Sequence, residues 1–181
     1  AEDDRAAVKW FRKAAEAGDA EAMRNLGVMY ANGEGVAEDD RAAVKWFRKA
    51  AEAGDAEAMR NLGVMYANGE GVAEDDRAAV KWFRKAAEAG DAEAMRNLGV
   101  MYANGEGVAE DDRAAVKWFR KAAEAGNAKA MCQLGFMYFK GEGVAEDHAE
   151  SYIWFSLAGA FGHPKAVEAR DLVAESLPAQ A

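Results

Sequence analysis

The 181-residue sequence is poor in the residue types from which catalytic sites are built. It contains no threonine, and its only serines and imidazoles are Ser151, Ser156, Ser176, His148 and His163. A catalytic nucleophile needs an adjacent base or a lowered pKa, and no GxSxG, HExxH or P-loop pattern is present. These absences argue against an enzyme, and we expect neither a cofactor nor a metal ion.

Cysteine, proline and long apolar runs are also scarce. Cys132 is the only cysteine, so no internal disulfide can form and the fold does not depend on an oxidising compartment. Two prolines and an aromatic content of 10% argue against disorder. No segment is long and apolar enough to span a bilayer, and no secretory signal is visible. We therefore expect a soluble protein without a membrane partner, compatible with the cytoplasm.

The chain is acidic, with a formal net charge of −9 that is spread along its length and is not concentrated in a tail. A distributed acidic charge keeps a protein soluble and repels phosphate backbones. Nucleic acid is therefore not an expected partner.

What the sequence has in abundance is repetition. Residues 1–36 recur letter for letter as residues 37–72 and 73–108, and the copying continues to Gly126, where Asn127 first departs from it. A fixed period of 36 residues is typical of stacked-repeat proteins, in which each unit contacts its neighbours. The sequence predicts one continuous solenoid domain with repeats at 1–36, 37–72, 73–108, 109–144 and 145–181, the last of which is also a C-terminal cap.

Each copy predicts two helices joined by a short turn. Apolar residues recur at spacings of three and four from Ala6 to Ala15, which predicts an amphipathic helix over about 4–17. Asp19 follows as the expected N-cap of a second helix over 20–32. Five such units predict an all-α protein with ten helices.

Gly27 lies inside the predicted second helix, where a glycine costs about 1 kcal/mol relative to alanine. We expect that another helix backbone passes too close to it for a side chain. After this helix, Gly33 and Gly35 permit a tight connection to the next repeat.

The residues with these roles carry a resemblance to a known family. The shared pattern comprises the segment 10–18, Ala22, the pair Leu26-Gly27, Tyr30 and the segment 33–36, and it recurs in register. By this pattern the chain resembles the Sel-one-like repeat family, a branch of the tetratricopeptide class. The resemblance implies a right-handed α/α superhelix, or solenoid, whose first helices line the concave side. It also implies an adaptor function and not catalysis.

The two ends of the array differ. In the last repeat, Arg170 and Asp171 replace the leucine and glycine of every earlier unit, as suits a cap on which no further repeat docks. We expect the last helix to open at His163-Pro164, with the proline in its first turn. The first repeat has no such device, so its packing face should be exposed.

Three identical copies also bear on the origin of the sequence. Natural repeats drift, so perfect identity indicates either a very recent duplication or a consensus-designed array in front of a natural-looking cap. We favour design, in which case the copies were chosen for stability and no ligand shaped them.

The first candidate interaction surface is a stripe of cations on the predicted first helices. These cations can pair with the carboxylates of a peptide or with its C-terminus. The competing interpretation is a solvated face balanced by Glu16 and by the acids of adjacent loops. The stripe comprises Arg5, Lys9, Arg12, Arg41, Lys45, Arg48, Arg77, Lys81, Arg84, Arg113, Lys117 and Arg120.

The second candidate surface is an apolar group in the last two repeats, where bulky residues replace smaller or charged ones. It comprises Phe136, Phe139, Tyr152, Ile153 and Leu157. We expect these side chains to bury against one another and against the cap. If they instead form an exposed patch, they mark an interaction site.

Three further groups have simpler explanations. Cys132 and His148 can be brought together across helices, but a substituted surface position explains the cysteine better. The Trp10-Phe11 pair recurs at core spacing, which favours packing over ligand stacking. An acidic cluster lacks the ligand spacing of a calcium loop and is better explained by helix capping. It comprises Glu34, Glu38, Asp39 and Asp40.

These observations predict a non-catalytic scaffold that binds a protein or peptide. One alternative is a structural module that self-associates head to tail through its uncapped first repeat. Another is a ligand-binding, enzyme-like relative. Family members described as binding cell-wall-like ligands carry cysteine pairs in each repeat, and this chain has none.

Overall fold

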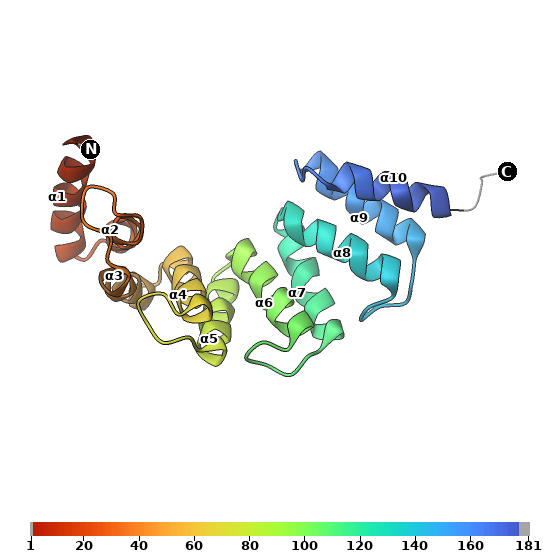
Figure 1. Cartoon of the computed structure of the whole chain (residues 1–181), viewed down its shortest axis with the longest axis horizontal. Helices are drawn as coiled ribbons and strands as arrows, with labels where there is room; N and C mark the ends of the chain where they lie inside the picture. Colours follow the sequence, from red (N-terminus) through yellow and green to blue (C-terminus); the bar gives the residue numbers. More distant parts are fainter. Residues whose placement is uncertain (1, 178–181) are drawn as a thin grey trace. The chain divides into compact units, whose positions relative to one another are not determined.

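The structure is a computed structural model that describes residues 2–177, so Ala1 of the first expected repeat and residues 178–181 of the last lie outside it. Within residues 2–177 the chain forms ten α-helices and no strand, which confirms the predicted all-α class (Figure 1). Consecutive helices pack against one another as a solenoid of five repeats. The chain divides into two compact units, Ala1–Asp91 and Ala92–Ala181, which are described separately.

Both units consist of helices of similar length in a regular order. The helices of the first unit are α1 (Glu2–Glu16), α2 (Ala20–Asn32), α3 (Asp40–Glu52), α4 (Ala56–Asn68) and α5 (Asp76–Glu88). The helices of the second unit are α6 (Ala92–Asn104), α7 (Asp112–Glu124), α8 (Ala128–Lys140), α9 (His148–Ala160) and α10 (Ala166–Ser176). No helix in the described range combines the length and the apolar character that crossing a membrane requires.

Side-chain caps fix where the helices begin and end. The Asp19 carboxylate accepts a hydrogen bond from the backbone N–H of Ala22 at 2.7 Å, so α2 begins and ends at the predicted residues. Gly33 ends α2 in the left-handed conformation, with φ of 68°. Asp39 caps α3 through the N–H of Ala42 at 2.9 Å. The predicted start of the first helix is therefore correct to within two residues.

The second helices α2, α4 and α8 pack more extensively on the first helix of the next repeat than on the first helix of their own. In the first unit, α2 contributes the fully buried Leu26, and α3 contributes Phe47, which is 3% exposed. Each copy of the sequence contains a first helix followed by a second helix. The closest packing, however, is between a second helix and the first helix of the following copy.

The close approach predicted at Gly27 is real, but the neighbouring group is not a backbone. A Cβ atom at Gly27 would lie 2.5 Å from ring carbons of Phe47. Gly135 and the Phe155 ring repeat the arrangement in the second unit, at 2.7 Å. The glycine is required because an aromatic ring from the next first helix lies flat against the second helix, which the pattern within one repeat does not reveal.

The last helix departs from the prediction at its start. Pro164 lies in a turn before α10 and not in the first turn of the helix, because the N–H of Ala166 bonds back to the carbonyl of His163 at 3.2 Å. Arg170 and Asp171 bond to each other at 2.7 Å on the outer side of α10. This charged pair therefore lies at the surface of α10.

Candidate interaction surfaces

The cationic stripe lies on the solvent-exposed side of the first helices. All twelve of its side chains are exposed. The third cation of a repeat is fixed by the second helix of the same repeat, since Arg12 donates to the Tyr30 hydroxyl at 2.8 Å and Arg48 donates to that of Tyr66 at 2.9 Å. These hydrogen bonds hold the third cation in place on its helix.

On α3, the predicted balance between the cations and nearby acids is not formed. Among the residues that the structure describes, Arg41, Lys45 and Arg48 make no ion pair with any carboxylate. Lys49, one turn further along α3, instead lies over the Trp46 ring at 4.5 Å from its centroid. The three cations of α3 therefore lack a carboxylate partner, which is the property that a binding surface for acidic groups needs.

Shallow grooves lie along this face in both units. The groove over α1 has a volume of about 690 Å³ and is lined by Arg5, Lys9 and Trp10, among others. The groove over α7 has a volume of about 620 Å³, and its lining includes Lys117 and Trp118. Each is large enough for a few peptide side chains and combines positive charge with an indole ring.

The two residues of the Trp-Phe pair differ in burial. Phe47 packs into the core as predicted, whereas Trp46 is only half buried, between the preceding repeat and the lysine of its own helix. Trp10 has no preceding repeat in this chain and is 70% exposed. Within the described residues, the face of α1 that corresponds to the covered face of α3 is thus exposed at Trp10.

The apolar group of the last two repeats does not bury as expected. Phe136, Phe139, Ile153 and Leu157 are between 39% and 48% exposed, and Tyr152 is half buried. The expectation of burial was wrong because positions 153 and 157 correspond to Lys9 and Lys13, which face solvent in the earlier repeats. The α10 helix packs on α9 elsewhere.

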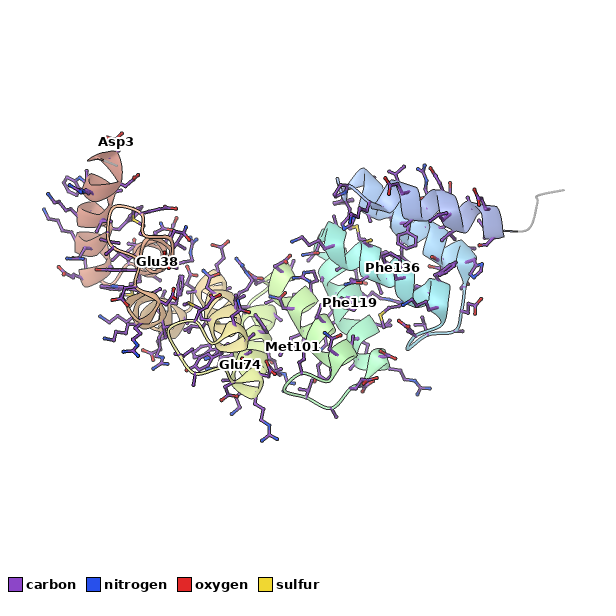
Figure 2. The ribbon with its side chains drawn as sticks, viewed as in Figure 1. Asp3, Glu38, Glu74, Met101, Phe119 and Phe136 are labelled. Atoms are coloured by element: carbon purple, nitrogen blue, oxygen red, sulfur yellow. The ribbon has the colours of Figure 1, made fainter. Side chains whose placement is uncertain are left out.

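The five apolar residues separate into two places. Phe136 and Phe139 lie on α8, where the first meets the Phe155 ring edge-on at 4.9 Å and the second stacks on His148 at 4.9 Å. Figure 2 labels Phe136 on this helix. Ile153 and Leu157 instead lie on α9. Sequence reasoning missed Phe161, which is 57% exposed and follows Leu157 by four residues. The interval of four residues from Ile153 to Leu157, continued once more, leads to Phe161 and could have identified it.

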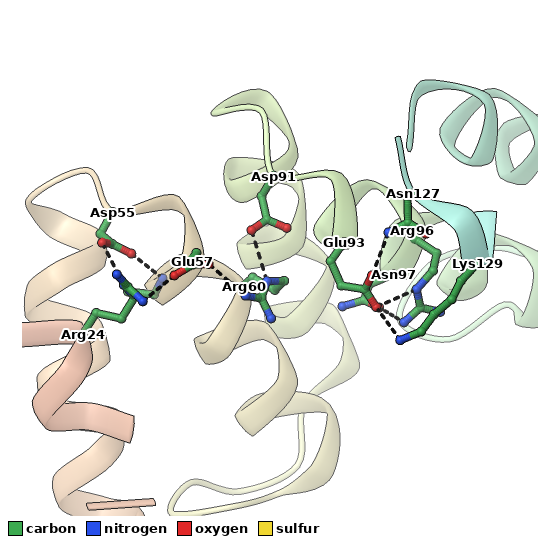
Figure 3. Close-up of polar contacts among 11 residues, drawn as sticks. Arg24, Asp55, Glu57, Arg60, Asp91, Glu93, Arg96, Asn97, Asn127 and Lys129 are labelled. Carbon is green, nitrogen blue, oxygen red and sulfur yellow. Dashed lines mark hydrogen bonds and ion pairs between the residues drawn. The ribbon is translucent and has the colours of Figure 1, made fainter. Parts of the chain in front are cut away.

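A second polar system ties neighbouring second helices together (Figure 3). In the first unit, Arg24 bonds the N-cap carboxylate of Asp55 at 3.2 Å and also pairs with Glu57. Arg60 bonds Asp91 in the same way at 3.1 Å. These charges link one repeat to the next and are not available to a ligand. This role was not visible in the pattern of one repeat because the partners are 31 residues apart.

The link changes form in the second unit, where Asn127 replaces the capping aspartate. Glu93 now accepts hydrogen bonds from Asn127 at 2.7 Å and from Arg96 at 2.8 Å, and Lys129 lies 3.6 Å away (Figure 3). Burial alone would raise the pKa of Glu93, but the hydrogen bond from Asn127 and the charges of Arg96 and Lys129 outweigh it and lower that pKa. Where asparagine replaces the capping aspartate, Glu93 therefore accepts the hydrogen bond that links the two repeats.

The structure does not bring Cys132 and His148 into a bond among the residues it describes. Cys132 occupies the repeat position of Arg24 but is 6% exposed, so its interpretation as a surface position was wrong. Burial raises the pKa of its thiol, which opposes reactivity. No group of three potential metal-ligating side chains comes together within residues 2–177.

His148 belongs to a Ser-His-Glu arrangement that looks like a catalytic triad. Its Nδ1 lies 2.8 Å from Ser176 Oγ, and its Nε2 lies 3.1 Å from Glu146. The serine hydroxyl also donates to the backbone carbonyl of Val173 at 2.6 Å, so its proton is engaged there. The contact between Ser176 and His148 joins the end of α10 to the start of α9.

Within the acidic cluster at the start of α3, Asp39 caps the helix, as predicted. Glu34 accepts a hydrogen bond from the side chain of Asn32 at 2.9 Å.

Comparisons with known proteins identify the Sel1 repeat in five consecutive stretches, residues 1–19, 20–55, 56–91, 92–127 and 128–163. A solved Sel1 repeat protein from Oxalobacter formigenes is 35% identical, with a TM-score of 0.86 over 92% of this chain and 66% of that one. A protective antigen of uropathogenic Escherichia coli with an SLR fold is 38% identical, with a TM-score of 0.89 over 93% of this chain and 36% of that one.

The chain thus spans about a third of the length of the E. coli antigen and 66% of the Oxalobacter protein. Cysteine rich protein B of Helicobacter pylori is 23% identical, with a TM-score of 0.59 over 72% of this chain and 94% of that one, and shows likeness of fold alone. None of the curated proteins matches the sequence. Sel1 repeat proteins are generally non-enzymatic interaction scaffolds. The chain belongs to the Sel1 repeat family.

Proposed function

We propose that this protein is a non-catalytic scaffold that binds acidic, extended segments of partner proteins along the exposed faces of its first helices. The observation that carries the proposal is the group Arg41, Lys45 and Arg48 on α3, whose side chains are exposed and make no ion pair with a carboxylate among the described residues. These cations stand out because the chain as a whole is acidic, at −9.

The grooves on this face support the same function. Each combines an indole with lysine and arginine side chains, so a peptide can place a carboxylate on the cations and an apolar group on the ring. The general role of Sel1 repeat proteins as interaction scaffolds agrees with a peptide or protein as the ligand.

The experiment is a calorimetric titration of the full chain with an acidic peptide at low and moderate salt. We expect binding that weakens as salt screens the charges. The double variant Lys45→Glu, Lys81→Glu should weaken binding. The matched control is Lys140→Glu, Lys165→Glu, which changes the net charge equally at exposed positions away from the first helices. Absence of heat at both salt concentrations, or equal loss in the two variants, would rule out the cationic stripe.

A second candidate function is self-association through the first repeat, which the 70% exposure of Trp10 favours. A partner helix for this face needs a glycine opposite Phe11, as Gly27 is opposite Phe47. At the other end of the chain Asp171 occupies that position, so a head-to-tail contact between copies meets a charged side chain. Light scattering over a concentration series tests this: a mass that stays at 19.5 kDa eliminates self-association.

A further inference from the structure

The second unit differs from the first in what its consecutive first helices present to solvent. On α7 the face is cationic, with Lys117 and Lys121 exposed at the repeat positions of Lys9 and Lys13. On α9 the same two positions carry Ile153 and Leu157, which are 48% and 39% exposed. One helix pair further along, the surface has changed from charged to apolar at the same register.

The apolar stretch on α9 is a continuous stripe. Ile153, Leu157 and Phe161 are spaced by four residues, so they lie on one side of the helix and just beyond its end. All three are at least 39% exposed. No charged side chain interrupts the stripe, whereas the copied helices place lysine at its first two positions. Three neighbouring exposed apolar groups on a Sel1 surface helix mark an interaction site.

The cationic groove on α7 reaches toward α9. Its lining includes Gly143 and Val144 in the loop that leads into α9, in addition to Lys117, Trp118 and Lys121. Trp154 of α9 also packs on the core cluster to which α7 contributes, so the two helices share one packed layer of the second unit. The charged groove and the apolar stripe therefore belong to neighbouring elements of one body.

We propose that α7 and α9 form one bipartite site for an extended peptide segment in which acidic residues are followed or preceded by apolar ones. The carboxylates pair with Lys117 and Lys121, and the apolar side chains cover Ile153, Leu157 and Phe161. An extended chain advances about 3.3 Å per residue, so a spacer of roughly three residues lets one peptide bridge about 10 Å between the two groups. This inference rests on the proposed function and adds the chemistry of the partner.

The test uses the full chain and three fluorescein-labelled peptides, with binding followed by anisotropy. The bipartite peptide is EEGSGLFG, the acidic peptide is EEGSGSSG, and the apolar peptide is SSGSGLFG. We expect EEGSGLFG to bind at least about tenfold more tightly than either of the other two. Equal affinity for EEGSGLFG and EEGSGSSG overturns the bipartite site but leaves the acidic scaffold intact. If no peptide binds at about 1 mM, both proposals fail.

Variants then locate the site. Ile153→Lys, Leu157→Lys restores the residues of the identical copies and is therefore expected to fold, as circular dichroism will verify. In this variant the preference for EEGSGLFG over EEGSGSSG should disappear while binding of EEGSGSSG is kept or strengthened. A preserved preference overturns the role of α9.

The charged half is tested by Lys117→Glu, Lys121→Glu against Lys45→Glu, Lys49→Glu, the same change on α3. Both pairs lie on helices of identical sequence, so their effects on net charge and on local packing match. We expect the first pair to weaken EEGSGLFG about tenfold or more and the second to weaken it less than about twofold. Equal losses in both variants would show general electrostatic attraction and overturn the site.

Discussion

Helices α1 and α3 share the sequence from Arg5 to Glu16, yet they have different surroundings. On α3, Phe47 is 3% exposed and Trp46 is half buried against the preceding repeat. On α1, the corresponding Phe11 is only half buried and Trp10 is 70% exposed. The helix forms in both cases, so its formation is local, whereas the burial of its aromatic residues comes from the helix pair before it.

The comparison shows where the stability of this array resides. The second helix packs most closely on the following first helix. An identical side chain therefore contributes little to stability on α1, where it is exposed, and much on α3, where the preceding helix pair buries it. Four predictions test this difference, in order of decreasing expected effect.

The largest effect is expected from removal of the aromatic ring that lies against Gly27. Phe47→Ala should reduce the free energy of unfolding by about 3–5 kcal/mol, because it leaves a cavity between α2 and α3. Phe11→Ala, the same change in the same sequence, should cost about 1 kcal/mol, because solvent already reaches that ring. Urea unfolding of both variants measures the difference, and equal losses would contradict the comparison.

The glycine on the other side of this contact gives the next effect. Gly63→Ala should destabilise by about 1–2 kcal/mol, because its Cβ would lie 2.5 Å from the Phe83 ring and the gain in helix propensity is only about 1 kcal/mol. Asp171→Ala, at the same repeat position where no repeat docks, should be close to neutral. Thermal unfolding of both variants is the measurement. Rescue of Gly63→Ala by Phe83→Leu would sharpen the assignment of the clash.

The polar link between α6 and α8 gives a pH-dependent effect. The pKa of Glu93 is lowered in the folded protein, so its ionised form contributes stability above the ordinary glutamate pKa of about 4.3. This contribution is lost as the pH falls through the lowered value. The stability advantage of the wild type over Glu93→Gln should therefore be greatest near neutral pH and shrink in acid. An advantage that stays constant down to about pH 3 would contradict it.

The smallest effect concerns Cys132, which occupies the repeat position of Arg24. Burial raises the pKa of its thiol, so alkylation by iodoacetamide at neutral pH should be at least about tenfold slower in the folded protein than in urea. Equal rates in the two states, followed by mass spectrometry, would mean that the position is open to solvent. Labelling in urea alone would confirm that Cys132 is buried in the second unit, at the repeat position where Arg24 forms an ion pair in the first unit.

Prediction from the sequence succeeded wherever the deciding interactions are local. The bounds of α2, the capping by Asp19 and the left-handed Gly33 all follow from contacts within a few residues. The prediction failed where the partner is one repeat away. The ring opposite Gly27 and the exposure of Ile153 depend on which face the next helix covers, which periodicity inside one copy cannot specify.

The candidate surfaces were predictable only in part, for the same reason. The cationic stripe could be read from its spacing, but the lack of a carboxylate partner for the cations of α3 could not, because Asp55 and Asp91 are bound by Arg24 and Arg60 across the repeat boundary. The apolar residues could be named and assigned to their helices, but the exposure of Phe136 and Ile153 could not, because it depends on which face the neighbouring helix covers.

The sequence by itself determined the period, the helices and their caps, and the family, because a helical repeat is specified by short-range spacing and by copying. Only the tertiary structure decided which identical residues are buried, which charges are satisfied and where charge gives way to apolar surface. These properties belong to the interface between one repeat and the next, and a side chain acquires them from its neighbour in space and not from its neighbours in the chain.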